Sequence, residues 1–161
     1  MRLLWAVAII AFAVDQLTKW WVMYGLDLLN RGLIDVASPY LRFVMAWNRG
    51  INFGVLASGS DVARWGLIVL SIAICAVVVW WARRKTNAWF MFGAGLVVGG
   101  ALGNVVDRVR FGAVADFLNM SCCGINNPYV FNVADISIFA GAGLLILMSG
   151  DDAERTARRS D

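Results

Sequence analysis

Two aspartates, Asp116 in VADF and Asp135 in FNVAD, are the residues of this chain best suited to catalysis. Each adjoins a long apolar stretch, and ionisable side chains at membrane depth are energetically expensive and mark function by default. Two neighbouring carboxylates split their pKa values, so that one holds a proton while the ionised one accepts a proton from water. Because these pKa values belong to the pair, we expect the two aspartates to act together in a hydrolytic reaction.

The absence of histidine removes several other chemistries. It excludes serine–histidine and cysteine–histidine catalysis and the HExxH zinc motif. The three cysteines, Cys75, Cys122 and Cys123, have no CxxC spacing, so we expect structural or incidental roles for them. We therefore expect no metal and no cofactor.

The sequence around Asp135 predicts the start of a helix. If Asn132 is the N-cap of an apolar helix beginning at residue 133, Asp135 occupies the third helical position. There the helix dipole and the free amide groups favour a negative charge, so we expect Asp135 to be the more readily ionised aspartate. A plain capping role for Asp135 is the alternative at this point.

The composition predicts an all-α polytopic membrane protein built as a single domain over residues 1–161. Of the 161 residues 60% are hydrophobic and the mean hydropathy is +0.69, whereas soluble domains are about half apolar. A bilayer-spanning helix needs about 20 apolar residues. The net charge of +3 is scattered with no basic stripe, so we expect no nucleic-acid partner. Four spans are predicted, at residues 3–24, 62–81, 88–106 and 133–149, followed by a charged, frayed tail at 150–161.

Asp15 and Lys19 interrupt the first predicted span at i,i+4 spacing, so they share one face of the helix. This spacing predicts a buried ion pair. The pair either serves only the packing of the helices or also shapes the floor of a site, and the sequence leaves both possibilities open.

The third predicted span has two patterned faces. Gly95, Gly99 and Gly103 repeat every four residues, the small-xxx-small pattern of closely packed membrane helices. Polar side chains gather on a second, broad face. Its members are Gly100, Asn104, Asp107 and Arg108. For the last two we expect a local ion pair at the membrane interface.

The segment between the first two spans predicts a small β-hairpin or sheet at the membrane surface, outside the cytoplasm. Residues 40–47 (YLRFVMAW) and 51–56 (INFGVL) alternate in polarity around the three-residue loop 48–50. Asp116 lies in a further strand-like segment, FGAVADFL. The sheet is either an ordinary surface hairpin or a cradle that holds an extended peptide.

Four spans place both termini on the same side of the membrane. The basic cluster of Arg83, Arg84 and Lys85 lies in a short loop on that side, which favours a cytoplasmic location for it. We therefore expect Asp116 and Asp135 near the outer face.

Five motifs occur in a fixed order along almost the whole chain: DQLTK, NRGINFG, GGALGNVVDR, VADF and FNVAD. In this order and on four spans, they make the chain resemble the bacterial lipoprotein signal peptidases (signal peptidase II), a family of membrane aspartic peptidases. The resemblance implies that Asp116 and Asp135 are the catalytic dyad. It implies supporting roles for Asp15, Lys19, Asn48, Gly100, Asn104, Asp107, Arg108 and Asn132.

The resemblance also implies the partners and the location. The substrates would be diacylglyceryl-modified prolipoproteins, cut just before the lipidated cysteine, in the inner membrane among membrane lipids. Globomycin-type cyclic peptides would be inhibitors, and we expect a monomer. Two positions depart from the commonest pattern, because Ile51 and Asn52 precede FG and Ile136 stands where a serine is usual. These departures concern the shape of the pocket rather than the dyad.

Two other functions are compatible with buried polar groups. Intramembrane Asp, Lys and Asn side chains also build the proton relays of small transporters or channels. Against that alternative, no inverted repeat is visible, and the carboxylates cluster at one membrane edge. A structural subunit of a membrane complex would need no paired aspartates, so it would tolerate Asp116→Asn and Asp135→Asn.

Overall fold

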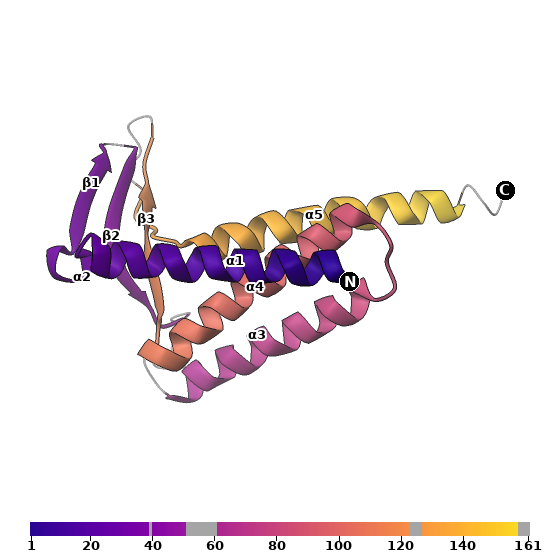
Figure 1. Cartoon of the computed structure of the whole chain (residues 1–161), viewed down its shortest axis with the longest axis horizontal. Helices are drawn as coiled ribbons and strands as arrows, with labels where there is room; N and C mark the ends of the chain where they lie inside the picture. The colour runs from indigo at the N-terminus through magenta and orange to yellow at the C-terminus, as the bar shows by residue number, and fades with distance from the viewer. Residues whose placement is uncertain (39, 51–60, 123–126, 158–161) are drawn as a thin grey trace.

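The computed structural model describes residues 1–38, 40–50, 61–122 and 127–157, with side chains described as far as residue 149. Long helices form an elongated bundle, a small sheet stands across one end of it, and both termini lie at the opposite end (Figure 1). The helices are α1 (Arg2–Trp20), continued by a π-helical turn η1 (Trp21–Gly25), then α2 (Leu28–Arg31), α3 (Asp61–Ala82), α4 (Ala88–Phe111) and α5 (Val133–Ala157). The strands are β1 (Leu33–Ala37), β2 (Leu41–Asn48) and β3 (Val114–Met120).

Three helical segments are long and apolar enough to cross a membrane: Arg2–Gly25, Asp61–Ala82 and Ala88–Phe111. These segments confirm the first three predicted spans as helices. The fourth predicted span is a shorter apolar helix, Val133–Ser149, so its crossing of the membrane stays a prediction.

Two helices run further than the sequence analysis predicted. α4 continues past residue 106 to Phe111 and stops where Gly112 adopts a left-handed conformation with φ of +76°, a common helix C-terminus. α5 continues through the charged tail to Ala157, where we had expected a frayed segment from residue 150. Four residues of this extension are good helix formers and favour its helical conformation: Ala153, Glu154, Arg155 and Ala157.

α4 is the central helix, and it packs against α1, α3 and α5. A Cβ atom added to Gly95 would lie 2.6 Å from the Leu4 carbonyl oxygen, and one added to Gly99 would collide with the Ala8 carbonyl oxygen. The small-xxx-small prediction is therefore confirmed, since this stripe brings α4 against the backbone of α1. Gly100 makes the corresponding close approach to α5.

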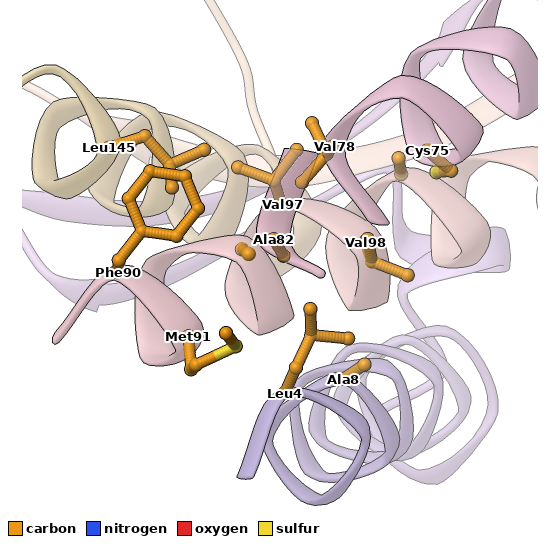
Figure 2. Close-up of a cluster of buried hydrophobic side chains, with 12 residues drawn as sticks. Leu4, Ala8, Cys75, Val78, Ala82, Phe90, Met91, Val97, Val98 and Leu145 are labelled. Atoms are coloured by element: carbon orange, nitrogen blue, oxygen red, sulfur yellow. The ribbon is translucent and has the colours of Figure 1, made fainter. Parts of the chain in front are cut away.

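The apolar core lies in the half of the bundle remote from the sheet. Figure 2 shows side chains from α1, α3, α4 and α5 meeting there, among them Leu4, Val78, Phe90, Val98 and Leu145. A second cluster under the sheet contains Val22, Leu28, Phe43 and Phe117. The first cluster joins the long helices to one another, and the second joins the sheet to the helices below it. Together they fix the positions of the polar residues that lie between them.

The sheet has the order β1-β2-β3, with both pairs antiparallel. Residues 40–47 do contain a strand, β2, and FGAVADFL contains β3, so both strand predictions are confirmed. The partner predicted for β2, residues 51–56, lies outside the described residues. The described partners are β1, which the sequence analysis did not assign as a strand, and β3, where Ala46 is opposite Asp116.

Candidate active site

Backbone pairing between β3 and Phe131 brings the two predicted catalytic segments together. The Phe131 carbonyl oxygen accepts hydrogen bonds from the amides of Phe117 (3.0 Å) and Leu118 (2.8 Å), and the Phe131 amide donates to the Leu118 carbonyl oxygen (3.0 Å). Because Asp116 precedes Phe117 and Asn132 follows Phe131, this pairing places the end of VADF beside the start of α5.

Asn132 and Asp135 form a reciprocal cap at the start of α5. The Asn132 side-chain oxygen accepts from the Asp135 amide (2.9 Å), and the Asp135 carboxylate accepts from the Asn132 amide (3.3 Å). This is the geometry of a capping box, with α5 beginning at Val133. The predicted N-cap at Asn132 and the third helical position of Asp135 are both confirmed.

Three asparagine side chains donate to the two carboxylates. Asn132 Nδ2 donates to Asp116 Oδ1 (2.5 Å), Asn48 Nδ2 to Asp116 Oδ2 (3.0 Å) and Asn104 Nδ2 to Asp135 Oδ1 (2.9 Å). These asparagines come from the N-cap position before α5, from β2 and from α4, respectively. Among the described residues, every hydrogen-bond donor to these two carboxylates is a neutral amide.

The same asparagines have their oxygen atoms occupied by other donors. Asn48 Oδ1 accepts from the Gly50 amide (3.0 Å), and Asn132 Oδ1 accepts from the amide of Asp135. Asn104 Oδ1 accepts from Lys19 Nζ (3.3 Å) and from Asn132 Nδ2 (3.2 Å). If one of these amide groups were turned by 180°, its nitrogen would lie against the donors and its oxygen would lie against a carboxylate. The network therefore fixes each amide group with its nitrogen toward a carboxylate.

Asp116 is only 2% exposed, and this burial has an electrostatic consequence. Desolvation raises the pKa of Asp116 from 3.8 to about 6. The hydrogen bond from Asn48 opposes this rise, and the nearby charge of Asp135 adds to it. Asp116 therefore keeps its proton to a higher pH than an ordinary aspartate, as the acid member of a carboxylate pair must.

A second pair of carboxylates lies buried between α1 and α4. Lys19 Nζ contacts Asp15 Oδ2 at 2.8 Å and Asp107 Oδ2 at 2.7 Å, so one ammonium bridges both acids. All three side chains are buried. The predicted Asp15–Lys19 ion pair is confirmed, and the contact with Asp107 extends it to a three-membered cluster.

The prediction that Asp107 pairs with Arg108 is wrong. Adjacent helical residues point about 100° apart around the axis, so Asp107 faces α1 while Arg108 faces elsewhere. Arg108 Nη1 donates to the Asn104 carbonyl oxygen of its own helix (3.3 Å), and its charge acts on Asp135 and Asp116. Arg108 thus belongs electrostatically to the site, without the predicted partner.

Backbone amides complete the buried cluster. Asp107 Oδ2 accepts from the amide of Ala115 (3.2 Å), and Asp15 Oδ1 accepts from the amide of Ala134 (2.9 Å). Gln16 Nε2 donates to both Asp15 and Asp107, at 3.1 Å in each case. The sequence analysis did not select Gln16, although a polar residue inside an apolar span, within DQLTK, was the available signal.

A further interaction that the sequence did not indicate closes the end of α4. Arg64 on α3 donates from Nε to the Arg108 carbonyl oxygen (2.8 Å) and from Nη2 to the Val109 carbonyl oxygen (2.9 Å). These carbonyl groups lie in the last turn of α4, where intrahelical donors run out, although the Arg108 carbonyl oxygen also accepts from the amide of Gly112 (3.0 Å). No local sequence pattern could have predicted this contact between two helices.

All ten predicted site residues lie in the described part of the chain. Nine of them are connected by the hydrogen bonds and ion pairs given above, and Gly100 joins them through packing, since its added Cβ would lie 2.5 Å from the Ala134 carbonyl oxygen. Among the described residues no group of three or more acidic or cysteine side chains is arranged to hold a metal. Cys75 is buried and free, Cys122 takes part in a disulfide, and Cys123 lies outside the described residues.

Comparisons with known proteins give one consistent result. The profile of the family described as "Signal peptidase (SPase) II" matches residues 7–150. The lipoprotein signal peptidase of Rhodopseudomonas palustris (strain ATCC BAA-98 / CGA009) is 39% identical over 142 residues, covering 86% of this chain and 85% of the relative. That of Methylorubrum extorquens (strain PA1) is 40% identical over 150 residues, covering 92% and 86%.

A solved structure described as a bacterial membrane enzyme superposes with a TM-score of 0.74 at 26% identity, covering 93% of this chain and 88% of that one. These similarities favour the peptidase prediction over the transporter and the structural subunit. With a family profile that spans most of its length, the chain belongs to the signal peptidase II family.

Proposed function

We propose that this chain is an aspartic endopeptidase that removes the signal peptide from diacylglyceryl-modified prolipoproteins, cleaving just before the lipidated cysteine, with Asp116 and Asp135 as its catalytic dyad. Membership of the signal peptidase II family supports the peptidase activity, and the relatives are named lipoprotein signal peptidases. The observation that carries the dyad is that both carboxylates accept hydrogen bonds from one residue, Asn132, through its side chain and its main chain.

The proposed reaction follows from the different surroundings of the two acids. Asp135, at the N-terminus of α5, is ionised and accepts a proton from a water molecule whose oxygen attacks the scissile carbonyl carbon. Asp116, which retains its proton, donates it to the carbonyl oxygen. The proton on Asp135 then passes to the amide nitrogen while the carbon–nitrogen bond breaks, and the proton on the oxygen returns to Asp116 as the carbonyl re-forms. The cysteine leaves with a free amino group.

The membrane-facing surface next to Asp135 supports a lipidated substrate. Ile136 is 48% exposed and Phe139 is 79% exposed, on the face of α5 that adjoins the half-buried Asp135. Exposed large apolar side chains on a membrane helix face the acyl chains. A substrate anchored by its diacylglyceryl group therefore approaches the dyad laterally from the bilayer, and β2 and β3 hold its extended peptide near the surface.

The proposal includes a topology of four membrane crossings in one domain. The apolar part of α5 rises about 25 Å at about 1.5 Å per residue, close to the bilayer core of about 30 Å. The sheet and the dyad lie at one end of the bundle, and both termini lie at the other (Figure 1). We place the termini in the cytoplasm and the dyad at the outer face of the inner membrane. From membership of the family we further propose that the protein acts as a monomer and that globomycin-type cyclic peptides inhibit it.

A cleavage assay on a purified diacylglyceryl-modified prolipoprotein tests the proposal. Wild type, Asp116→Asn, Asp135→Asn and the control Asp27→Asn are compared in the presence of a metal chelator. Asp27 is an exposed aspartate in the left-handed conformation, which asparagine also tolerates. We expect wild type and the control to cleave and both dyad variants to be folded but inactive. Cleavage by either dyad variant at the wild-type rate would refute the dyad, and an inactive wild type would refute the substrate.

A further inference from the structure

The buried ammonium of Lys19 takes no part in the proposed reaction, yet it occupies the centre of the polar network. It joins a carboxylate of its own helix, Asp15 (2.8 Å), to a carboxylate of α4, Asp107 (2.7 Å). A third contact runs to the side-chain oxygen of Asn104 at 3.3 Å. Burying three ionised groups is costly, so an arrangement of this kind needs a reason beyond packing.

The two carboxylates that Lys19 joins each hold one catalytic segment by its backbone. Asp107 accepts the amide of Ala115, the residue immediately before Asp116. On the other side, Asp15 accepts the amide of Ala134, the residue immediately before Asp135. The separation of Asp15 and Asp107, which Lys19 sets, therefore determines the separation of the two catalytic aspartates.

The third contact of Lys19 acts on the same geometry. By donating to Asn104 Oδ1, the ammonium keeps the Asn104 amide group turned with Nδ2 toward Asp135, where it donates at 2.9 Å. All three contacts of Lys19 thus lead to a member of the dyad. The routes through Asp15 and Asp107 take one hydrogen bond and one residue, and the route through Asn104 takes one hydrogen bond.

We propose that Lys19 is a positioning residue that sets the separation and orientation of Asp116 and Asp135 by bridging Asp15 and Asp107. The inference rests on the proposed function, because it assumes that these two aspartates are the dyad. The competing explanation is that Lys19 only neutralises buried negative charge. A misplacement of about 1 Å in an active site can cost about 100-fold in rate, so the two explanations predict different kinetics.

Three variants separate the explanations: Lys19→Met, Lys19→Arg, and the double variant Lys19→Met with Asp107→Asn. The single methionine variant removes the bridge and leaves two buried carboxylates uncompensated. The double variant also removes the bridge, but it restores the original net charge of the cluster, because one positive and one negative group are lost together. The arginine variant keeps a cation that can contact two acids. For each, kcat, KM and Tm are measured on the lipidated substrate.

We expect Lys19→Met to lower Tm and to lower kcat about 100-fold. KM should change less than about threefold, because Lys19 does not contact the surface that binds the lipid. The double variant should recover most of the Tm but not the kcat. Lys19→Arg should recover part of the kcat. Parallel recovery of Tm and kcat in the double variant would show charge neutralisation alone and would overturn the proposal, as would wild-type kcat in folded Lys19→Met.

Asp107→Glu carries the test if neither methionine variant folds. It keeps every charge and lengthens one arm of the bridge by a methylene group, so the proposal predicts a loss of kcat at a Tm near that of wild type, and an unchanged kcat contradicts it. Asp116→Asn and Asp135→Asn are assayed alongside. If those variants cleave, the proposed function has failed; if they are inactive and the predicted kcat pattern is missing, only the role of Lys19 has failed.

Discussion

The molecule contains two pairs of aspartates that are linked through Asn104, and their hydrogen-bond donors differ. Asp15 and Asp107 share the ammonium of Lys19 and also accept hydrogen bonds from backbone amides. Asp116 and Asp135 accept hydrogen bonds from neutral amides alone, as far as the described residues go. The first pair is thus hydrogen-bonded to a full positive charge, whereas the second pair is hydrogen-bonded to dipoles and the charge of Arg108 acts on it without a hydrogen bond.

This difference agrees with the proposed division into a structural pair and a reactive pair. A shared cation attracts both carboxylates of a pair and offsets the repulsion between them. Amide donors orient the carboxylates without cancelling their mutual repulsion, and this repulsion adds to the desolvation that raises the pKa of Asp116 to about 6. Asn104 stands between the pairs, accepting from Lys19 and donating to Asp135, so the rigid pair supports the reactive one.

The largest expected effect is a separation of activity from stability at Asp116. We expect Asp116→Asn to lose at least about 1,000-fold in kcat. Removing the buried charge favours the folded state at neutral pH by at most about 3 kcal/mol, because an acid whose folded pKa is raised by about two units contributes stability below the unfolded pKa of 3.8 and loses it as the pH rises through about 6. The new amide group opposes this gain by about 1–3 kcal/mol, because its Nδ2 faces the amide donor of Asn48 or Asn132. We therefore expect a stability near that of the wild type in chemical denaturation at pH 7.5, and a loss of more than about 3 kcal/mol would contradict this account.

The opposite pattern is expected in the structural pair. Asp15→Ala removes one acid from Lys19 and leaves the Ala134 amide without its acceptor. We expect a loss of about 2–4 kcal/mol in the free energy of unfolding, because a broken buried pair is costly while Lys19 still retains Asp107. Unfolding in a denaturant series, with Asp27→Asn as the matched control, measures the loss. Stability equal to that of the control would remove the distinction between the two pairs.

A third change places a cation within hydrogen-bonding reach of Asp116. Asn48 is exposed and donates to Asp116, so Asn48→Lys places an ammonium near that carboxylate without a packing conflict. The charge lowers the pKa of Asp116, so a smaller fraction of Asp116 holds its proton at neutral pH. We expect kcat/KM to fall about 100-fold, against a smaller loss in the uncharged control Asn48→Met, which has a similar length. Equal losses in both variants would mean that charge is not the deciding factor.

The smallest expected effect is a shift of the pH profile. If Asp116 must be protonated, kcat/KM of the wild type should decline as the pH rises through about 6. The hydrogen bond from Asn48 lowers the pKa of Asp116, so removing it in Asn48→Met should move this alkaline limb upward by a fraction of a unit. Profiles of both enzymes on the same lipidated substrate test the direction, and a downward shift would contradict it.

Local sequence signals predicted much of this structure. Apolar length predicted three helical spans, the glycine stripe predicted the contact of α4 with α1, and the FNVAD pattern predicted the cap at Asn132, because each of these depends on residues close together in the chain. The i,i+4 spacing predicted the Asp15–Lys19 pair for the same reason.

The failures involve contacts between segments far apart in the chain. The partner of Asp107 is Lys19, which only the packing of α1 on α4 brings near, so the neighbouring Arg108 was the wrong choice. The strand β1 is short and mostly exposed, and its alternation is too weak to be recognised without its partner β2. The contact of Arg64 with the end of α4 left no trace in the sequence of either helix.

The position of Asp15 and Lys19 on the same helix has a consequence for biogenesis. α1 enters the membrane before α4 has been synthesised, so Lys19 must first be accommodated without Asp107. Asp15 lies one turn away on the same face and supplies a counter-ion at once, which lowers the cost of inserting either charge alone. The later arrival of α4 adds Asp107 to a pair that already exists, and α5 brings the amide of Ala134 last. The order of synthesis thus delays assembly of the proposed dyad until the final helix is in place, and we expect the unfinished chain to have no peptidase activity.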